Sequence, residues 1–118
     1  MKASNIVDQK AVAFGIRIVK VCRFLQEEKK EYILSKQLLR SGTAIGALIK
    51  EGEFAESKAD FIHKLTISLK EANETKYWLL LLNESNYIDE KPYESVNNDC
   101  LELISLLVCI LKKLKLKE

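Results

Sequence analysis

SKQLLRSGTAIGALIKEGEFAESKADFIHKLTISLKEANETKYWL, residues 35–79, decides the fold because it holds two long helical patterns joined by a turn. In each pattern, apolar and small residues recur at spacings of three and four, which places them on one face of a helix. The first face consists of Leu34, Leu38, Ser41, Ile45, Leu48 and Gly52, and the second of Phe61, Leu65, Ser68, Ala72, Thr75 and Leu79. Ser57 followed by Asp60 resembles a capping box that opens the second helix.

Helical patterns also flank this central stretch. The first is a stripe of Val7, Ala11, Phe14, Ile18, Val21 and Leu25. Ser35 offers a side-chain oxygen to cap the helix that follows, and Pro92 fits the first turn of a last helix. The predicted helices span roughly residues 6–28, 36–54, 58–83 and 91–116. With 118 residues, four Gly and one Pro, the sequence predicts a single all-α domain over residues 1–118, a four-helix bundle.

The last helix is too apolar for an ordinary surface helix. Its heptad seam consists of Val96, Cys100, Leu103, Leu107, Ile110 and Leu114. Four further apolar residues, Leu101, Ile104, Val108 and Leu111, lie beside this seam and make the apolar surface wider than the ~100° stripe that a surface helix needs. We expect a second copy of the chain to cover this surface. Two glycines inside the second helix each cost about 1 kcal/mol relative to Ala, which indicates close approach of another helix, with local tolerance as the alternative. The predicted oligomer or close helix contacts are Gly42, Gly46, Leu101, Ile104, Val108 and Leu111.

The best-ordered polar feature is a basic strip on the helix over residues 36–54. Its three cations lie within about 80° of each other on a helical wheel, and no acid of that helix interrupts them. The first helix adds three more cations on its flank. Such cations suit phosphates as point charges, although a solvated helix face is the alternative interpretation. The candidate nucleic-acid contacts are Lys36, Arg40, Lys50, Lys10, Arg17 and Lys20.

The patterns that carry catalysis or metal binding are missing from the sequence. His63 is the single histidine, so a di-iron site built from two Glu-x-x-His motifs cannot form. The acids Glu51, Glu53 and Glu56 are explained as a solvated helix end rather than as a cation site. No nucleophile stands beside an oriented base. We therefore predict no catalytic residue, no metal ligand and no cofactor, and we expect a protein that is not an enzyme.

Cys22, Cys100 and Cys109 are odd in number and lie inside apolar helical patterns. This predicts reduced, buried thiols in a cytoplasmic protein. Arg17 and Lys20 interrupt the apolar run over residues 11–21, so no signal peptide is expected at the N-terminus. The last helix contains an apolar run over residues 103–111, which is much shorter than the ~20 residues of a membrane span, so no membrane association is expected.

Three segments in order, RSGTAIGA at 40–47, AESKADFIHKL at 55–65 and LKEANET at 69–75, resemble the four-helix-bundle family of proteins encoded in intervening sequences of bacterial 23S rRNA genes. This resemblance implies an up-down-up-down antiparallel bundle that assembles into a cyclic homopentamer. It also implies similarity to the accessory protein of diversity-generating retroelements, a pentameric ring whose basic surface engages nucleic acid. Leu48 stands where relatives commonly carry Asn, and Lys50 where a small residue is common. The family offers no established catalytic residue.

The residue patterns and the resemblance together predict a homo-oligomeric bundle that binds structured RNA or another nucleic acid through repeated basic surfaces. The alternative is a scaffold that binds a protein partner and no nucleic acid. A net charge of +2 is too small to decide between them.

Overall fold

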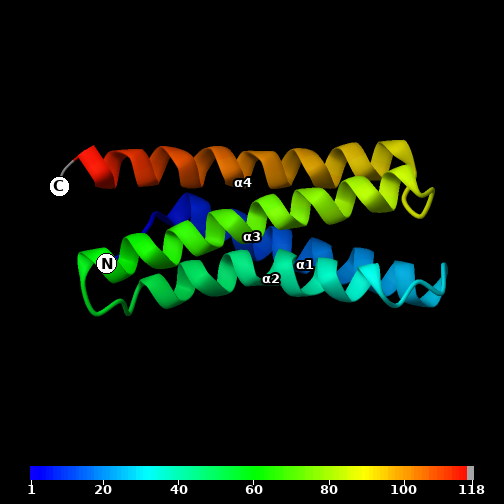
Figure 1. Ribbon diagram of the computed structural model, residues 1–118, viewed down its shortest axis with the longest axis horizontal. Helices are drawn as coiled ribbons and strands as arrows, with labels where there is room; N and C mark the ends of the chain where they lie inside the picture. Colours follow the sequence, from blue (N-terminus) through cyan, green and yellow to red (C-terminus); the bar gives the residue numbers. More distant parts are fainter. Residues whose placement is uncertain (117–118) are drawn as a thin grey trace.

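Four α-helices and no strand make up residues 1–116, the part of the chain that the computed structural model describes. The helices are α1 (Asn5–Glu27), α2 (Leu34–Gly52), α3 (Lys58–Glu84) and α4 (Glu90–Leu116), and they run up and down in turn (Figure 1). Each observed helix end lies within two residues of the predicted one. Residues 117 and 118, the last two of the predicted domain, lie outside the described residues.

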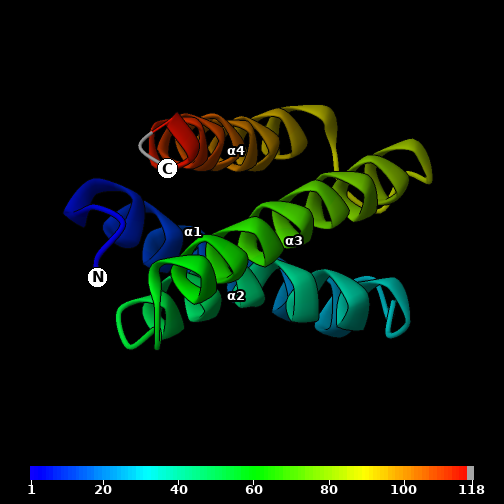
Figure 2. The same ribbon diagram turned by 60° about the vertical axis from the view of Figure 1, so that its left-hand side comes forward.

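The helices form a bundle in which sequence neighbours pack side by side and α4 packs back against α1. The bundle measures 47 × 21 × 19 Å. The α1–α2 and α3–α4 turns lie at one end, which we call the two-turn end (Figures 1 and 2). The chain begins near the opposite end, where the α2–α3 turn also lies (Figure 1). Side chains that are far apart in sequence therefore meet at each end.

The buried stripes agree with the sequence on α3 and differ locally on α1 and α2. Every predicted residue of the α3 stripe is buried, and Leu82 extends it. On α1, Cys22 is buried in place of Val21. On α2, Ile49 is buried in place of Leu48. Because α2 packs closely against both α1 and α3, its buried face is wider than one narrow stripe.

The heptad seam predicted for α4 is wrong in its last two turns. Leu111 is buried there, while Ile110 and Leu114 are only half-buried. A straight α-helix turns away from a strict heptad repeat by about 20° per heptad. Over two heptads from Val96, this rotation moves Ile110 toward α1 and brings Leu111 onto the core.

The predicted cap of α3 is correct. Ser57 is extended at the N-cap, and its hydroxyl oxygen accepts a hydrogen bond of 3.0 Å from the backbone N–H of Asp60. The return bond of the capping box is displaced by one residue, because the Asp60 carboxylate accepts from the backbone N–H of Glu56 at 3.1 Å. Two backbone donors at the start of α3 are thereby satisfied.

The predicted cap of α2 is wrong. The helix begins at Leu34, so Ser35 lies buried in its first turn, and the N-cap position is Ile33, whose side chain makes no capping bond. The carboxylate of Glu31 caps the helix instead. It accepts hydrogen bonds from the backbone N–H groups of Ile33, Leu34 and Ser35 at 3.3, 3.1 and 2.8 Å.

Small polar residues in the predicted stripes bring α2 and α3 close together. The Ser68 hydroxyl donates to the Ile45 carbonyl at 2.9 Å, and the hydroxyls of Thr75 and Ser41 are hydrogen-bonded at 2.9 Å. All three hydroxyl side chains are buried. Because each hydroxyl has a partner, its burial avoids the cost of an unsatisfied polar group.

Candidate nucleic-acid interface

Two of the predicted cations of α1 reach across to α4. Arg17 Nη1 lies 2.7 Å from Asp99 Oδ2, and Lys10 Nζ lies 3.0 Å from Glu102 Oε1. Lys20, the third predicted cation, is exposed one turn beyond Arg17. Within residues 1–116, no acid lies within ion-pair distance of Lys20. The three cations therefore lie along the side of α1 that faces α4.

A groove runs between α1 and α4 beside these cations. It contains two hollows, of about 210 and 390 Å³, and Arg17 lines both. Lys10 lines the smaller hollow and Lys20 the larger one. The apolar floor of the larger hollow is formed by Val21, Phe24, Ile88, Pro92 and Val96. We call this feature, with its edge of Lys10, Arg17 and Lys20, the α1–α4 groove.

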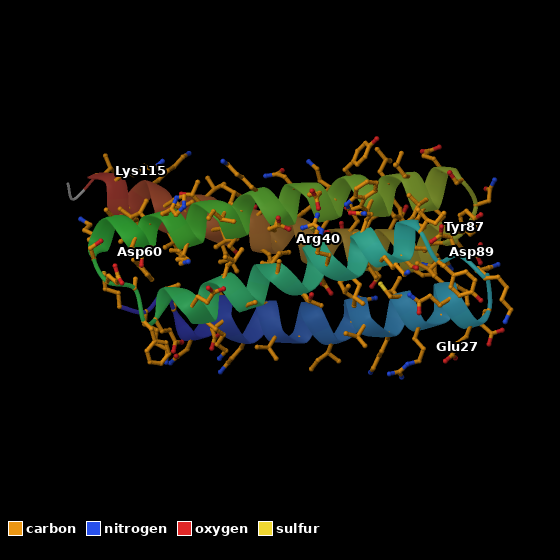
Figure 3. All side chains as sticks on the ribbon, turned by 60° about the horizontal axis from the view of Figure 1, so that its bottom comes forward. Glu27, Arg40, Asp60, Tyr87, Asp89 and Lys115 are labelled. Carbon is orange, nitrogen blue, oxygen red and sulfur yellow. The ribbon has the colours of Figure 1, made fainter. Side chains whose placement is uncertain are left out.

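The three predicted cations of α2 differ in their surroundings. Arg40 pairs with two acids of α3, Glu74 and, at 3.2 Å, Glu71, and its side chain lies between α2 and α3 (Figure 3). Lys50 Nζ lies 2.9 Å from Asp8 Oδ2 on α1, and this hydrogen bond raises the pKa of Lys50. Lys36 is exposed near the two-turn end.

The basic strip on α2 is therefore less free than the sequence indicated. No acid of α2 interrupts it, but acids of α1 and α3 reach two of its three cations. A helical wheel of α2 contains no information about side chains on the helices beside it. The structure thus divides the six candidate contacts into a row along the α1–α4 groove and a dispersed set on α2.

Gly42 and Gly46 both face α1 of the same chain. A Cβ atom at Gly42 would lie 2.9 Å from Cγ1 and Cγ2 of Ile18, and one at Gly46 would lie 3.5 Å from Ala11. The close approach at these glycines is therefore between α1 and α2 within one copy. Gly42 is buried by this contact, whereas Gly46 stays partly exposed.

The residues predicted to widen the apolar surface of α4 have separate positions. Leu111 is 5% exposed and belongs to the core of a single copy, so its predicted place on an outer surface was wrong. Leu101 is 39% exposed, and Ile104 and Val108 are half-buried. These three remain at the surface of the chain.

One apolar surface stripe was missed in the sequence. Val12, Ile16 and Val19 lie on α1 and are 44%, 55% and 39% exposed. Their spacing of four and three residues is the ordinary signal of a helical stripe. The sequence therefore contained the signal, but the more regular core stripe of the same helix concealed it.

The three thiols differ in exposure. Burial raises the pKa of Cys22 and of Cys100 to about 12, whereas Cys109 is exposed, which corrects the prediction that all three are buried. Because the thiolate is the reactive form, we expect one thiol to react quickly with a chromogenic disulfide reagent at pH 8 in the native protein, and three in denaturant. Cys109→Ser should leave no fast-reacting thiol, and three fast-reacting thiols in the native protein would contradict the burial of Cys22 and Cys100.

Metal binding and a membrane span have little support in the described part of the chain. His63 is exposed. Among residues 1–116, no three side chains of His, Cys, Asp or Glu come together as a metal ion would require. The helices over the same residues are each too short or too polar to cross a membrane.

Comparisons with known proteins give the family. A comparison with curated proteins found no match. The chain is similar to a crystallised protein of unknown function from the S23 ribosomal protein family of Bacteroides thetaiotaomicron, with 55% sequence identity and a TM-score of 0.91 over 95% of this chain and 99% of that one. The family model for 23S rRNA-intervening sequence proteins matches residues 3–109. Because that match covers nearly the whole chain, this protein belongs to the family of 23S rRNA-intervening sequence proteins.

Proposed function

We propose that this protein is a non-enzymatic, homo-oligomeric bundle of the cytoplasm that binds structured RNA through the α1–α4 groove. The observation that carries the proposal is the row of Lys10, Arg17 and Lys20 along one edge of that groove. At 1.5 Å per residue these cations are spaced by about 10 and 5 Å along α1, so a phosphate backbone in the groove meets several of them. The family's association with 23S rRNA genes supports RNA as the anionic partner.

The ion pairs across the groove do not prevent phosphate binding. The side chains of Arg17 and Lys10 are both more than one-third exposed, as are their acidic partners. Exposed ion pairs of this kind contribute about 0–1 kcal/mol, so a phosphate displaces the carboxylate at little cost. Self-association repeats the groove on every copy, which strengthens binding of a long RNA through multivalency. The three α2 cations are a second, weaker contact surface in this proposal. Their acidic partners Glu71 and Asp8 are only 20% and 15% exposed, so a phosphate displaces them less readily than the exposed acids of the groove.

Replacement of the three groove cations by Gln tests the proposal. We expect a structured RNA to bind at least about tenfold more weakly at low salt, because each lost phosphate contact removes counterion release. The slope of log K against log salt should fall by about two, since each contact contributes about 0.7–0.9. Fluorescence anisotropy over a salt series measures both quantities. The variant carries Lys10→Gln, Arg17→Gln and Lys20→Gln.

A matched variant controls for net charge. This control variant removes three cations from α3. One of them, Lys64, also belongs to an ion pair, since its Nζ lies 3.7 Å from Glu51 Oε1. We expect this control to bind RNA within about twofold of the original protein. Equal losses in the two variants would overturn the α1–α4 groove as the RNA-binding surface. The control carries Lys58→Gln, Lys64→Gln and Lys70→Gln.

A protein partner is the second candidate, and the apolar floor of the larger hollow supports it. That floor suits an apolar side chain better than a phosphate. A single protein recovered from lysate at high salt, with no RNA bound, would favour this function. Of the floor residues, Val96 is buried and Phe24 is 44% exposed, so Phe24→Ala is the variant expected to abolish that recovery without disturbing the core.

A further inference from the structure

The larger hollow of the α1–α4 groove combines an apolar floor with an exposed aromatic ring. It lies between the last turns of α1 and the first turns of α4, at the two-turn end of the bundle (Figure 1). Phe24, whose ring belongs to this floor, is 44% exposed. The volume of about 390 Å³ is at the small end of the range of about 300–1,000 Å³ that ligand pockets cover. The hollow therefore has room for one small apolar group and not for a helix or strand of a partner.

Positive charge borders the floor on the α1 side. Arg17 and Lys20 of α1 line the hollow, and so does Lys29, which follows the end of α1. Lys29 Nζ lies 5.9 Å from the centre of the Phe24 ring, which is a cation–π contact. Both lysines are exposed, and within residues 1–116 no acid lies within ion-pair distance of either. An anionic group beside the floor would therefore meet two cations that have no counterion in the described part of the chain.

The α3–α4 turn contributes Tyr87 and Asp89 to the wall of the hollow (Figure 3). Hydrogen bonds hold this turn. The backbone N–H of Tyr87 donates to the Leu82 carbonyl at 2.9 Å, and the Asn83 side-chain amide donates to the Ile88 carbonyl at 3.0 Å. Ile88, between the two lining residues, is buried. The turn therefore holds a second aromatic residue and a carboxylate at fixed places beside the floor.

Of the described residues, Asp89 is the one acid that lines the larger hollow. It is exposed and directly precedes α4, a position at which an Asp side chain often accepts hydrogen bonds from the helix. Within residues 1–116, however, its carboxylate forms neither a hydrogen bond nor an ion pair. An ionised carboxylate only accepts hydrogen bonds. Asp89 therefore favours a ligand that offers N–H donors to this wall, and it opposes an acidic peptide.

An unpaired nucleotide of an RNA has the properties that this hollow requires of a ligand. Its base is flat and stacks on aromatic side chains, its Watson–Crick edge is free to form hydrogen bonds, and its phosphates are anionic. Guanine suits Asp89 because its edge has two adjacent donors, N1–H and N2–H, for the two oxygens of one carboxylate. Adenine, cytosine and uracil each offer one donor group on that edge. A phenyl side chain from a protein partner would fill the floor but has no donor for Asp89.

We propose that the larger hollow binds one unpaired guanine of a structured RNA. The base lies on the apolar floor and stacks against Phe24, and its N1–H and N2–H groups donate to the Asp89 carboxylate. The phosphates on either side of this nucleotide meet Lys20 and Lys29. Binding an unpaired base avoids most of the cost of breaking a base pair. The inference rests on the proposed function, because the cations of the α1–α4 groove hold the rest of the RNA, and it adds the base that the protein recognises.

Three hairpin RNAs that differ only in one bulged nucleotide test the inference. The bulge carries guanosine, inosine or an abasic ribose, so the stem and the phosphate charges are the same in all three. We expect the guanosine RNA to bind at least about thirtyfold more tightly than the abasic RNA, because stacking and two hydrogen bonds are lost with the base. Inosine lacks only the N2 amino group, and we expect it to bind about fivefold more weakly than guanosine. Fluorescence anisotropy at one salt concentration measures the three affinities.

Phe24→Leu tests the stacking contact, because it removes the ring and keeps an apolar side chain. The preference for guanosine over the abasic RNA should fall by about fivefold or more, while binding of the abasic RNA stays within about twofold. Phe24→Tyr keeps a ring and should keep the preference. Phe54→Leu is the matched control, because Phe54 is 86% exposed and lies in the α2–α3 turn at the opposite end of the bundle. It should bind the three RNAs as the original protein does.

Asp89→Asn tests the hydrogen bonds to the edge of the base. Asn begins a helix as well as Asp does, so the start of α4 is retained. The amide keeps only one acceptor oxygen, and we expect the difference between guanosine and inosine to fall to within about twofold. The ratio of these two affinities is the readout, because loss of a carboxylate by itself strengthens the binding of every RNA.

The outcomes separate this inference from the proposed function. If the guanosine and abasic RNAs bind equally, while loss of the groove cations Lys10, Arg17 and Lys20 still weakens both, the hollow binds no base and the RNA-binding groove stands. A guanosine preference that survives both Phe24→Leu and Asp89→Asn would place the base elsewhere and overturn the inference. If none of the three RNAs binds at low salt, the proposed function and the inference are both wrong.

Discussion

Gly42→Ala is expected to lower the free energy of unfolding by about 1–2 kcal/mol, and Gly42→Val by about 3 kcal/mol. A Cβ atom at this position would lie 2.9 Å from both Cγ atoms of Ile18, which is fully buried. Both Cγ atoms are bonded directly to the Cβ atom of Ile18, a β-branched residue. Rotation of a flexible side-chain end therefore cannot relieve the overlap. The cost of separating α1 from α2 exceeds the ~1 kcal/mol that a helix gains when Ala replaces Gly.

Gly46→Ala is the matched control, one turn along the same helix. Its new Cβ atom would make an ordinary contact of 3.5 Å with Ala11, so the helix-propensity gain is retained. We expect Gly46→Ala to raise the free energy of unfolding by about 0.5 kcal/mol. Urea unfolding at one fixed protein concentration measures both variants, because self-association changes apparent stability. The same sign for both glycines would contradict the α1–α2 spacing at Gly42.

The fold was predictable because helix periodicity and turn chemistry act locally. The α3 stripe and the Ser57 cap depend on residues within one or two turns of each other, and both were predicted correctly. Errors arose where the rotation of one helix against its neighbours decides burial. Leu111 is in the core because α4 follows the 3.6-residue period of a straight helix, whereas a strict heptad favours Ile110.

The candidate site was less predictable because ion pairs join residues that are far apart in sequence. Arg40 meets Glu71, 31 residues away, and Lys50 meets Asp8, 42 residues away. Such partners are fixed by the order and rotation of the packed helices, which a wheel of one helix does not contain. The α1–α4 groove likewise exists only once α4 has packed back against α1. Residue types alone therefore identified the cations but not which of them line a groove.

Glu31→Ala is expected to lower the free energy of unfolding by about 2–3 kcal/mol, which is more than an ordinary N-cap contributes. The Glu31 side chain is almost completely buried, and its carboxylate accepts hydrogen bonds from three backbone N–H groups at the start of α2. Charged acceptors make stronger hydrogen bonds than neutral ones, and a negative charge at a helix N-terminus also interacts favourably with the helix dipole. Truncation to Ala leaves these donors without their partner in a partly buried turn.

Two further variants separate the role of the carboxylate from a general loss of charge. Glu31→Gln keeps one acceptor oxygen without the charge, so we expect about half the loss, roughly 1 kcal/mol. Glu27→Ala removes an exposed acid from the end of α1 at the same end of the bundle (Figure 3), and should change stability by less than about 0.5 kcal/mol. If Ser35 were the cap, Glu31→Ala would behave like Glu27→Ala. Because Ser35 lies inside the helix and donates its hydroxyl to the Glu31 carbonyl at 2.8 Å, we expect the larger loss at Glu31.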